Sequence, residues 1–180
     1  MKVAKHPSGF QQQIEQIASV EHLMPGVLII HDLSGRVLWM SKMGLEFLGA
    51  SMEELLSSSA EEYYCRYFNE SDAKDYVPKI LGLLERNNDD EIITCFQQVR
   101  YREHLDWTWH MSSTRIFYRD DQKRPLYTIT MSFPIDAMHH MVNKAGKLLD
   151  ENNFLRHNYN RYCRLSKRER EVLKYMVLGK

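Results

Sequence analysis

Residues 26–40 read Gly26-Val27-Leu28-Ile29-Ile30-His31-Asp32-Leu33-Ser34-Gly35-Arg36-Val37-Leu38-Trp39-Met40, and this stretch decides the fold. Two short runs, residues 27–31 and 37–40, are dominated by aliphatic residues that favour strands. Residues 32–35 lie between them and have the side chains typical of tight turns. The stretch therefore predicts a β-hairpin.

An amphipathic helix is expected before the hairpin, and several short helices are expected after it. Apolar residues recur at helical spacing over residues 10–23. Ser51 and Ser59 each begin a capping box, in which a serine and a glutamate three positions later satisfy free backbone N–H groups. A longer helix is expected from Asn69 to about residue 86, and Pro78 should kink or restart it because proline cannot donate to the preceding turn.

Three long strands complete the predicted body. Residues 91–101, 107–118 and 125–133 are strand-like stretches separated by polar turns. Two strands, several helices and then three sequential strands indicate an α+β sandwich. We expect a five-stranded antiparallel sheet with short helices on one side, plus N-terminal and C-terminal helices.

This order of elements, with several local motifs, resembles the PAS family over residues 24–137. The hairpin at 26–40 resembles the family's opening hairpin, and Asp106-Trp107-Thr108-Trp109 resembles the strand that usually carries a tryptophan. Pro134-Ile135-Asp136 resembles the family's closing corner. The resemblance implies a sensor domain that encloses a cavity between helices and sheet. One departure is Ser41-Lys42, which stands where the family often has Asn-Pro.

Several side chains are candidates for lining such a cavity. The apolar candidates for binding a small, partly apolar molecule are Trp39, Phe47, Phe96, Trp109, Met111 and Met131. The alternative that these residues simply fill the core stays open. His31 and His110, each in an expected strand, are the polar candidates. The sequence does not show which face of the sheet is inward.

No cofactor can be named from the sequence. Haem would require a histidine on the long helix, and residues 70–86 contain none. Residues 64–69 resemble the Cys-Arg-Phe-Leu-Gln core of the flavin-binding LOV subfamily, and Cys65 stands at the position of the reactive cysteine. However, Tyr64 replaces the preceding Asn of that subfamily, and residues 107–118 lack the Asn pair that holds the flavin ring.

Motifs of enzymes, metal sites and membrane spans are missing from the sequence. There is no serine-centred elbow, phosphate-binding glycine loop or metal-binding helix motif. The three cysteines and eight histidines are too scattered for a disulfide framework or a metal site. No apolar run approaches the length of a membrane span or a signal core. We therefore expect a cytoplasmic protein that is not an enzyme.

Residues 165–180 carry a second resemblance. They read Leu165-Ser166-Lys167-Arg168-Glu169-Arg170-Glu171-Val172-Leu173-Lys174-Tyr175-Met176-Val177-Leu178-Gly179-Lys180. Ser166 and Glu169 form a capping box, Val172 and Leu173 begin an apolar stripe, and Gly179 suits a helix C-cap. The stretch resembles the first, supporting helix of the LuxR-type helix-turn-helix domain of bacterial transcription regulators. The resemblance implies a DNA-binding domain cut within that helix, with its recognition helix absent from the chain.

Charge is distributed unevenly along a chain whose formal net charge is zero. From Arg156 onward there are eight lysines and arginines and two glutamates, so this end carries +6 and the first 155 residues carry −6. A basic end suits a nucleic-acid-binding module. A solvated linker with a basic bias is the alternative.

A helical connector is expected over residues 138–164. Apolar and small residues alternate at spacings of four and three, as in a coiled-coil seam, at Met138, Val142, Ala145, Leu149 and Asn152. This pattern favours a homodimer, although a helix folded back on the sheet would also produce it.

Four segments are thus expected: an N-terminal helix (1–23), a sensor (24–137), a connector (138–164) and the beginning of a DNA-binding domain (165–180). Together they predict the sensor part of a one-component transcription regulator. Its partners would be DNA, a small-molecule ligand and a second copy of the chain, with no membrane contact. A stand-alone PAS-type interaction module and a flavin-based photo- or redox sensor are the alternatives.

Overall fold

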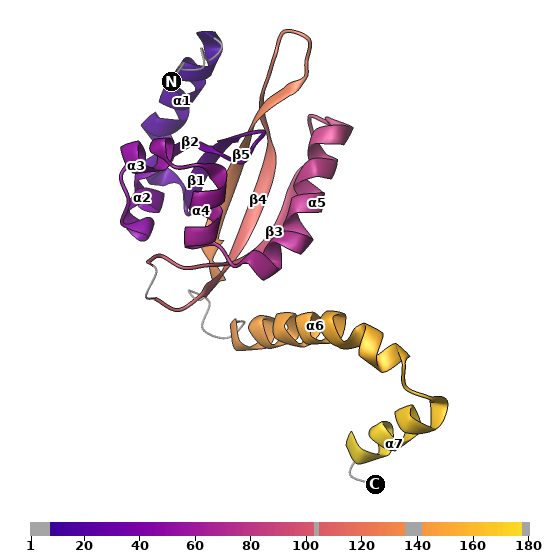
Figure 1. Ribbon diagram of the computed structural model, residues 1–180. Helices are drawn as coiled ribbons and strands as arrows, with labels where there is room; N and C mark the ends of the chain where they lie inside the picture. The colour runs from indigo at the N-terminus through magenta and orange to yellow at the C-terminus, as the bar shows by residue number, and fades with distance from the viewer. Residues whose placement is uncertain (1–7, 103–104, 136–141, 178–180) are drawn as a thin grey trace. The chain divides into compact units, whose positions relative to one another are not determined.

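The computed structural model describes residues 8–102, 105–135 and 142–177 (Figure 1). Contacts between residues divide the chain into two units, residues 1–137 and residues 138–180. The first unit contains a β-sheet with short helices, and the second contains two helices.

The first unit is built on a five-stranded antiparallel sheet. Its strands are β1 (Val27–Asp32), β2 (Val37–Met40), β3 (Ile93–Val99), β4 (Thr108–Arg119) and β5 (Pro125–Pro134). They lie in the order β2-β1-β5-β4-β3, so the opening hairpin forms one edge and the last strand pairs with the first. The predicted α+β sheet is confirmed, and each of the three later strands begins and ends within two residues of its predicted bounds.

The turn between β1 and β2 is fixed by one carboxylate. Oδ1 of Asp32 accepts hydrogen bonds from the backbone N–H of Ser34 (2.8 Å) and of Arg36 (3.0 Å). Gly35 adopts a φ of 84°, in the left-handed region that glycine tolerates best. The hairpin predicted from this stretch is confirmed.

Four helices connect the two halves of the sheet, and two precede it in the described residues. They are α1 (Ser8–Val20), the 3₁₀ helix η1 (Glu21–Leu23), α2 (Lys42–Leu48), α3 (Met52–Ser57), α4 (Ala60–Tyr67) and α5 (Glu70–Arg86). Both predicted capping boxes, at Ser51 and Ser59, are formed, and the Asn69 side chain caps α5. Helix α5 continues through Pro78, so the predicted restart is wrong.

Hydrophobic clusters lie on both faces of the sheet. On the inner face, Val27 and Ile29 of β1 belong to a cluster with Leu48 and Tyr63 from the short helices. On the outer face, Ile30 packs in a cluster with Phe10 of α1. Alternate residues of β1 therefore serve two cores, because successive side chains of a strand point to opposite faces.

Ser41 lies directly after β2 and hydrogen-bonds to β1. Its hydroxyl accepts a hydrogen bond from the backbone N–H of Leu28 (3.0 Å), and its own N–H donates to the Leu28 carbonyl (2.8 Å). The side chain is buried. At the position where the family often has asparagine, this serine extends the β1–β2 pairing.

Helix α2 approaches the sheet so closely that Gly44 has no room for a side chain. A Cβ there would lie 2.5 Å from Cγ1 of Val27 and 2.7 Å from Cγ of Met40. We therefore expect Gly44→Ala to lower the free energy of unfolding, measured by urea denaturation, by about 1–3 kcal/mol.

Gly82→Ala in α5 is the matched control for this substitution. Its Cβ would meet only the side chain of Arg86, which is flexible. Alanine is also the better helix former, so we expect stability to be unchanged or raised by up to about 1 kcal/mol. Equal destabilisation by the two substitutions would contradict the close approach of α2.

The second unit contains α6 (Val142–Cys163) and α7 (Lys167–Val177). The predicted capping box of α7 is formed, since the Ser166 N–H donates to Glu169 Oε2 (2.7 Å) and the Glu169 N–H donates to Ser166 Oγ (3.3 Å). The side chains of Val172 and Leu173 are 52% and 43% exposed. Some positions used in the predictions lie outside the described residues, among them Asp136, Met138 and Gly179.

Across the described ranges, no helix combines the length and the apolar composition needed to cross a membrane. The same residues contain no group of three or more His, Cys, Asp or Glu side chains placed to hold a metal ion.

Candidate functional site

Two cavities lie between the inner face of the sheet and the helices that cover it. The smaller has a volume of about 30 Å³, which is room for about one water molecule. The larger has a volume of about 420 Å³, which lies within the range of small-molecule sites. The larger cavity is therefore the candidate binding site.

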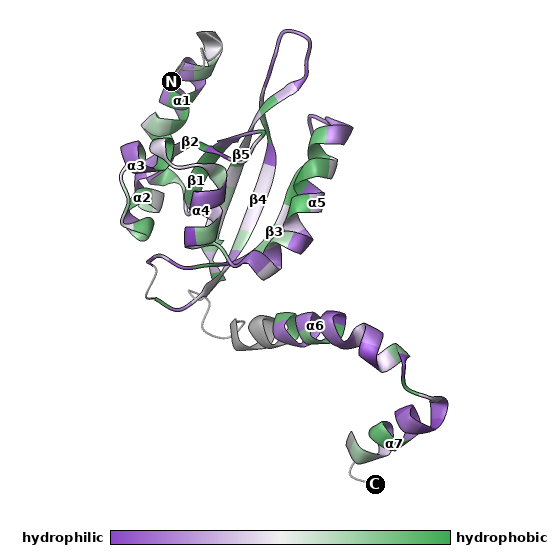
Figure 2. Cartoon of the chain, in the orientation of Figure 1, coloured by the Kyte–Doolittle hydropathy of each residue, from purple (hydrophilic) through white to green (hydrophobic). Residues whose placement is uncertain are grey.

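The larger cavity has an apolar roof and a polar floor. Aliphatic side chains of α5 form much of the roof: Val77, Ile80, Leu81 and Leu84. Strand residues with hydroxyl or amide groups form much of the floor: Gln97, Ser112, Thr114, Thr128 and Thr130. The middle of β4 is accordingly pale in Figure 2, because serine and threonine have intermediate hydropathy. Such a site suits a molecule with one apolar side and one hydrogen-bonding side.

Three of the four hydroxyl groups of the floor are paired across neighbouring strands. Thr114 and Thr130 share a hydrogen bond of 2.8 Å between their Oγ1 atoms, and Ser112 Oγ donates to Ser132 Oγ at 2.9 Å. These pairs follow the β4–β5 register, in which each of these residues lies directly opposite its partner. Cross-strand pairing allows polar side chains to be buried at modest cost.

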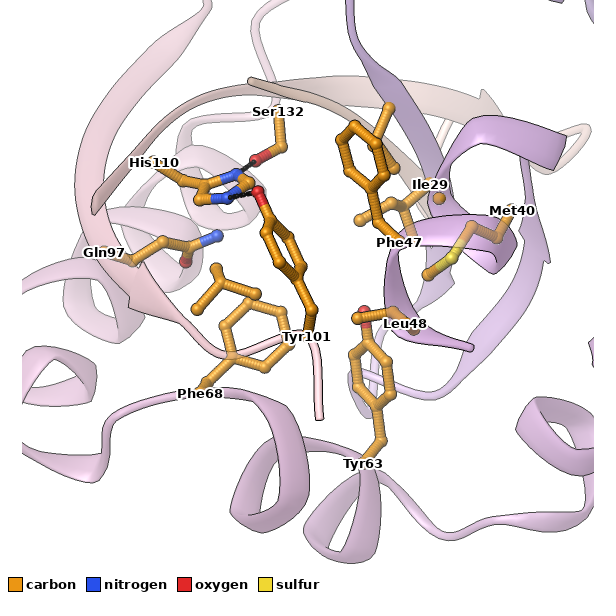
Figure 3. A pocket seen from close by; sticks show the side chains of 13 residues that line it. Ile29, Met40, Phe47, Leu48, Tyr63, Phe68, Gln97, Tyr101, His110 and Ser132 are labelled. Atoms are coloured by element: carbon orange, nitrogen blue, oxygen red, sulfur yellow. Dashed lines mark hydrogen bonds between the residues drawn. The ribbon is translucent and has the colours of Figure 1, made fainter. Parts of the chain in front are cut away.

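A chain of hydrogen bonds runs from the smaller cavity to the larger one, and Figure 3 shows its first part, from Tyr101 through His110 to Ser132. The Tyr101 hydroxyl bonds to Nε2 of His110 (2.9 Å), and Nδ1 of His110 bonds to Ser132 Oγ (3.1 Å). Ser132 accepts from Ser112, which in turn accepts from Nε2 of Gln97 (2.9 Å). Gln97 lines both cavities, so the two are connected by side chains.

His110 is fully hydrogen-bonded and uncharged. Both ring nitrogens have partners, and burial lowers the pKa of this histidine from 6.5 to about 4. The imidazole is therefore neutral at physiological pH and serves as a polar link in the chain.

His31 differs from His110 at one ring nitrogen. Its side chain lines the larger cavity and is only 8% exposed, and its Nε2 has no hydrogen-bond partner in the part of the chain that the structure describes. The ring lies near Tyr63 and Tyr64, with centroid separations of 6.2 and 6.4 Å. Burial lowers its pKa to about 4, although the charge of Asp32 acts in the opposite direction.

No family model matches this chain, and no curated protein matches its sequence. Solved structures do match. A light-oxygen-voltage domain solved in work on a flavin analogue is 17% identical, with a TM-score of 0.54 over 81% of this chain and 98% of that one. The LOV protein of Rhodobacter sphaeroides is 14% identical, with a TM-score of 0.55 over 75% of this chain and 73% of that one.

A third match has the same fold. The N-terminal domain of a diguanylate cyclase with a PAS/PAC sensor, from Marinobacter aquaeolei, is 15% identical, with a TM-score of 0.50 over 64% of this chain and 99% of that one. The chain has a PAS-like fold. The PAS-like domain shares its architecture with these proteins. The sequence identities are so low that the likeness establishes the fold and not the function.

The six apolar candidates are divided by the sheet of the PAS-like domain. Phe47 lines only the smaller cavity, which is too small for the predicted ligand. The other five line neither cavity: Trp39, Phe96, Trp109, Met111 and Met131. Met111 lies between the inward residues His110 and Ser112, so strand alternation directs it to the opposite face. Trp39 packs against the outer cluster around Ile30.

The polar candidates were placed better. His31 lines the larger cavity and His110 the smaller one. The polar floor itself was missed, although a signal was present: Ser112 and Thr114 repeat at a spacing of two on β4, as do Thr128 and Thr130 on β5. Small hydroxyl residues at every second position of two adjacent strands indicate one shared polar face.

The cysteine that resembles the reactive residue of LOV domains does not fit that role in this PAS-like domain. Cys65 is exposed and lines neither cavity. Cys95 does line the larger cavity, but burial raises the pKa of its thiol, which disfavours the reactive thiolate. The thiols therefore do not fit a photochemical flavin site.

Proposed function

We propose that the PAS-like domain is a sensor that binds a small organic molecule in the larger cavity. The observation that carries this proposal is the cavity of about 420 Å³, whose roof is apolar and whose floor holds paired hydroxyl groups and the buried ring of His31. Concave sites with mostly apolar walls and a few placed polar groups are typical of ligand-binding domains.

Native mass spectrometry of freshly purified protein tests this proposal. We expect a bound molecule to appear as added mass, and Ala73→Trp, which places an indole in the cavity wall, to remove it. Lys74→Trp is the matched control, because Lys74 is exposed on the same helix and lines neither cavity. Protein without added mass that is also not stabilised by any member of a diverse compound library would contradict the proposal.

A second proposal concerns the output of the sensor. We propose that α7 belongs to a LuxR-type helix-turn-helix unit, and that ligand binding changes DNA affinity through the connector and its dimerisation. The capping box at Ser166 and Glu169, the exposed Val172 and Leu173, and the basic charge from Arg156 onward support it. A stand-alone interaction module remains the competing function.

Selection from a random DNA pool by the full gene product tests the output. We expect one sequence to be enriched, and we expect sedimentation to show a dimer. A gene product that enriches no sequence would favour the stand-alone module, and a strict monomer at high concentration would rule out the connector as a dimer seam.

A further inference from the structure

We infer that the larger cavity binds an uncharged molecule whose acceptor oxygen, such as that of a ketone, takes hydrogen bonds from the phenol hydroxyls of Tyr64 and Tyr76, while its apolar body lies against α5. This inference rests on the proposed sensor function and names the chemical class of the ligand. It is carried by the hydroxyl groups that a molecule in the cavity can reach and by the charges of the cavity walls.

Three hydroxyl groups in the cavity wall have no hydrogen-bond partner among the described residues, namely those of Tyr64, Tyr76 and Thr128. None of them is among the fully enclosed unpartnered atoms of those residues, so each presents surface that a bound molecule can touch. Nε2 of His31 is one of the enclosed atoms and is out of reach of a ligand. The free hydroxyl groups, rather than the imidazole, are therefore available for recognition.

The rest of the floor is engaged within the sheet. Thr114 and Thr130 bond to each other across β4 and β5, and Ser112 belongs to the hydrogen-bond chain. Thr128 has no such partner on β4, because the residue opposite it there is the apolar Ile116. A phenol is more acidic than an aliphatic hydroxyl and is the stronger donor, so we assign the ligand contact to the two tyrosines rather than to Thr128.

The two phenol groups lie in the same part of the cavity and keep their protons. Burial raises the pKa of Tyr64 to about 12 and also raises the pKa of Tyr76. Electrostatic interaction with Cys95 adds to both shifts, and Tyr64 itself adds to the shift of Tyr76. A Cβ on Gly35 would lie 3.7 Å from the Tyr64 hydroxyl oxygen, which places this hydroxyl beside the β1–β2 turn. Both groups are therefore neutral hydrogen-bond donors at physiological pH.

The charges of the walls disfavour ionised ligands. Among the described residues that line the cavity there is no lysine or arginine, and the one carboxylate is Asp32. An anion would be desolvated near this carboxylate without a compensating cation. Oδ1 of Asp32 already accepts hydrogen bonds from the N–H and hydroxyl of Ser34 and from the N–H of Arg36, so the carboxylate is stabilised without a cationic ligand. An uncharged ligand is therefore expected.

One face of α5 combines the polar and the apolar contacts. Tyr76, Ile80 and Leu84 follow one another at a spacing of four, so they share a face of the helix, and all three line the cavity. The two aliphatic side chains offer no hydrogen bond. A flat molecule with a carbonyl at its edge can therefore bond to the phenol while its body lies along the aliphatic side chains.

Five probes that share one ring system test the inference on the full chain. They are 2-acetonaphthone, its hydrocarbon isostere 2-isopropenylnaphthalene, 2-naphthol, 2-naphthoate and 2-naphthylmethylammonium, titrated at neutral pH and followed by protein NMR. We expect the ketone to bind about tenfold more tightly than the isostere, in which a CH₂ group replaces the oxygen, because the ketone gains net hydrogen bonding. 2-Naphthol, which is a better donor than acceptor, and both ions should bind more weakly than the ketone.

Tyr64→Phe and Tyr76→Phe supply the decisive comparison. Each keeps the ring and removes only the hydroxyl, so the isostere should bind as before, while the preference for the ketone falls about threefold in each variant and vanishes in the double variant. The free variants should unfold at the wild-type temperature, because these hydroxyls have no partner among the described residues. Tyr118→Phe is the matched control and should keep the preference, since Tyr118 packs in the outer cluster and lines neither cavity.

Other outcomes overturn the inference in distinguishable ways. A preference for the ketone that survives the double variant, or that disappears in Thr128→Val instead, would assign the polar contact to another group of the wall. Tighter binding of 2-naphthol than of the ketone would show that the ligand donates rather than accepts, and tightest binding of either ion would exclude an uncharged ligand. Equal binding of the ketone and its isostere to the wild type would refute recognition by the phenols but not the sensor proposal. Binding of no probe up to its solubility limit would count against the sensor proposal itself.

Discussion

Acidification from pH 6.5 to about 4 is expected to remove several kcal/mol from the free energy of unfolding, because two buried histidines must stay neutral in the native state. Burial lowers the pKa of His31 and of His110 from 6.5 to about 4. Between these values the unfolded chain binds protons that the native protein excludes, so stability is full above pH 6.5 and falls as the pH approaches 4.

The size of this effect follows from the two pKa shifts. Each pKa unit corresponds to about 1.4 kcal/mol, so each histidine contributes up to about 3 kcal/mol over the whole interval. Acidic groups add to the loss at lower pH: hydrogen bonds within the two capping boxes lower the pKa of Glu54 and Glu62 below the ordinary value of 4.5. The histidine contribution is therefore clearest above about pH 5.

Urea unfolding across this pH range measures the effect. We expect the His31→Phe/His110→Gln double variant to flatten the dependence, whatever its stability at neutral pH. His22→Gln is the control, since His22 is exposed and its loss should leave the slope unchanged. A double variant with the wild-type slope would show that these rings do not resist protonation.

Phe10→Ala is expected to release α1 from the outer face of the sheet. The Phe10 ring is 2% exposed and lies 4.2 Å from the ring of Tyr127, centroid to centroid, with edge contacts to Phe117 and Tyr118. Truncating a buried phenylalanine costs about 3–5 kcal/mol. The measured loss cannot exceed the free energy with which α1 docks, because a released helix no longer contributes to stability.

Hydrogen exchange distinguishes release of α1 from weakening of the whole domain. A helix of 13 residues is marginal alone in water, so α1 amides should lose protection in Phe10→Ala while the sheet amides keep theirs. Gln11→Ala, at an exposed neighbouring position, should change neither set. Continued protection of α1 in Phe10→Ala would mean that other contacts hold the helix.

The elements that could be predicted from the sequence are those that local chemistry determines. The turn at 32–35 and the capping boxes at Ser51, Ser59 and Ser166 each depend on side chains within a few residues of one another. Pro78 is an exception: its local chemistry predicted an interruption of the helix, but α5 continues through it.

The inward face of the sheet could not be predicted, because long-range pairing determines it. Along β4, apolar Trp109 and Met111 alternate with polar His110 and Ser112, so hydrophobicity alone favours the wrong face. Burial of the polar set is tolerable because β5, whose Ser132 lies opposite Ser112, supplies matching hydroxyls. The sequence of one strand does not show which strand pairs with it. Most of the apolar candidates were therefore assigned to the wrong face of the sheet.

Because Gln97 lines both cavities, occupancy of the larger one has a consequence at the far end of β4. A ligand that displaced Ser112 from the side-chain amide of Gln97 would remove the first hydrogen bond of the chain that continues through Ser132 and His110 to Tyr101. Thermodynamic linkage makes such an effect reciprocal. If the ligand changes the affinity of the Tyr101 hydroxyl for a binding partner, that partner must change the affinity of the cavity for the ligand by the same factor.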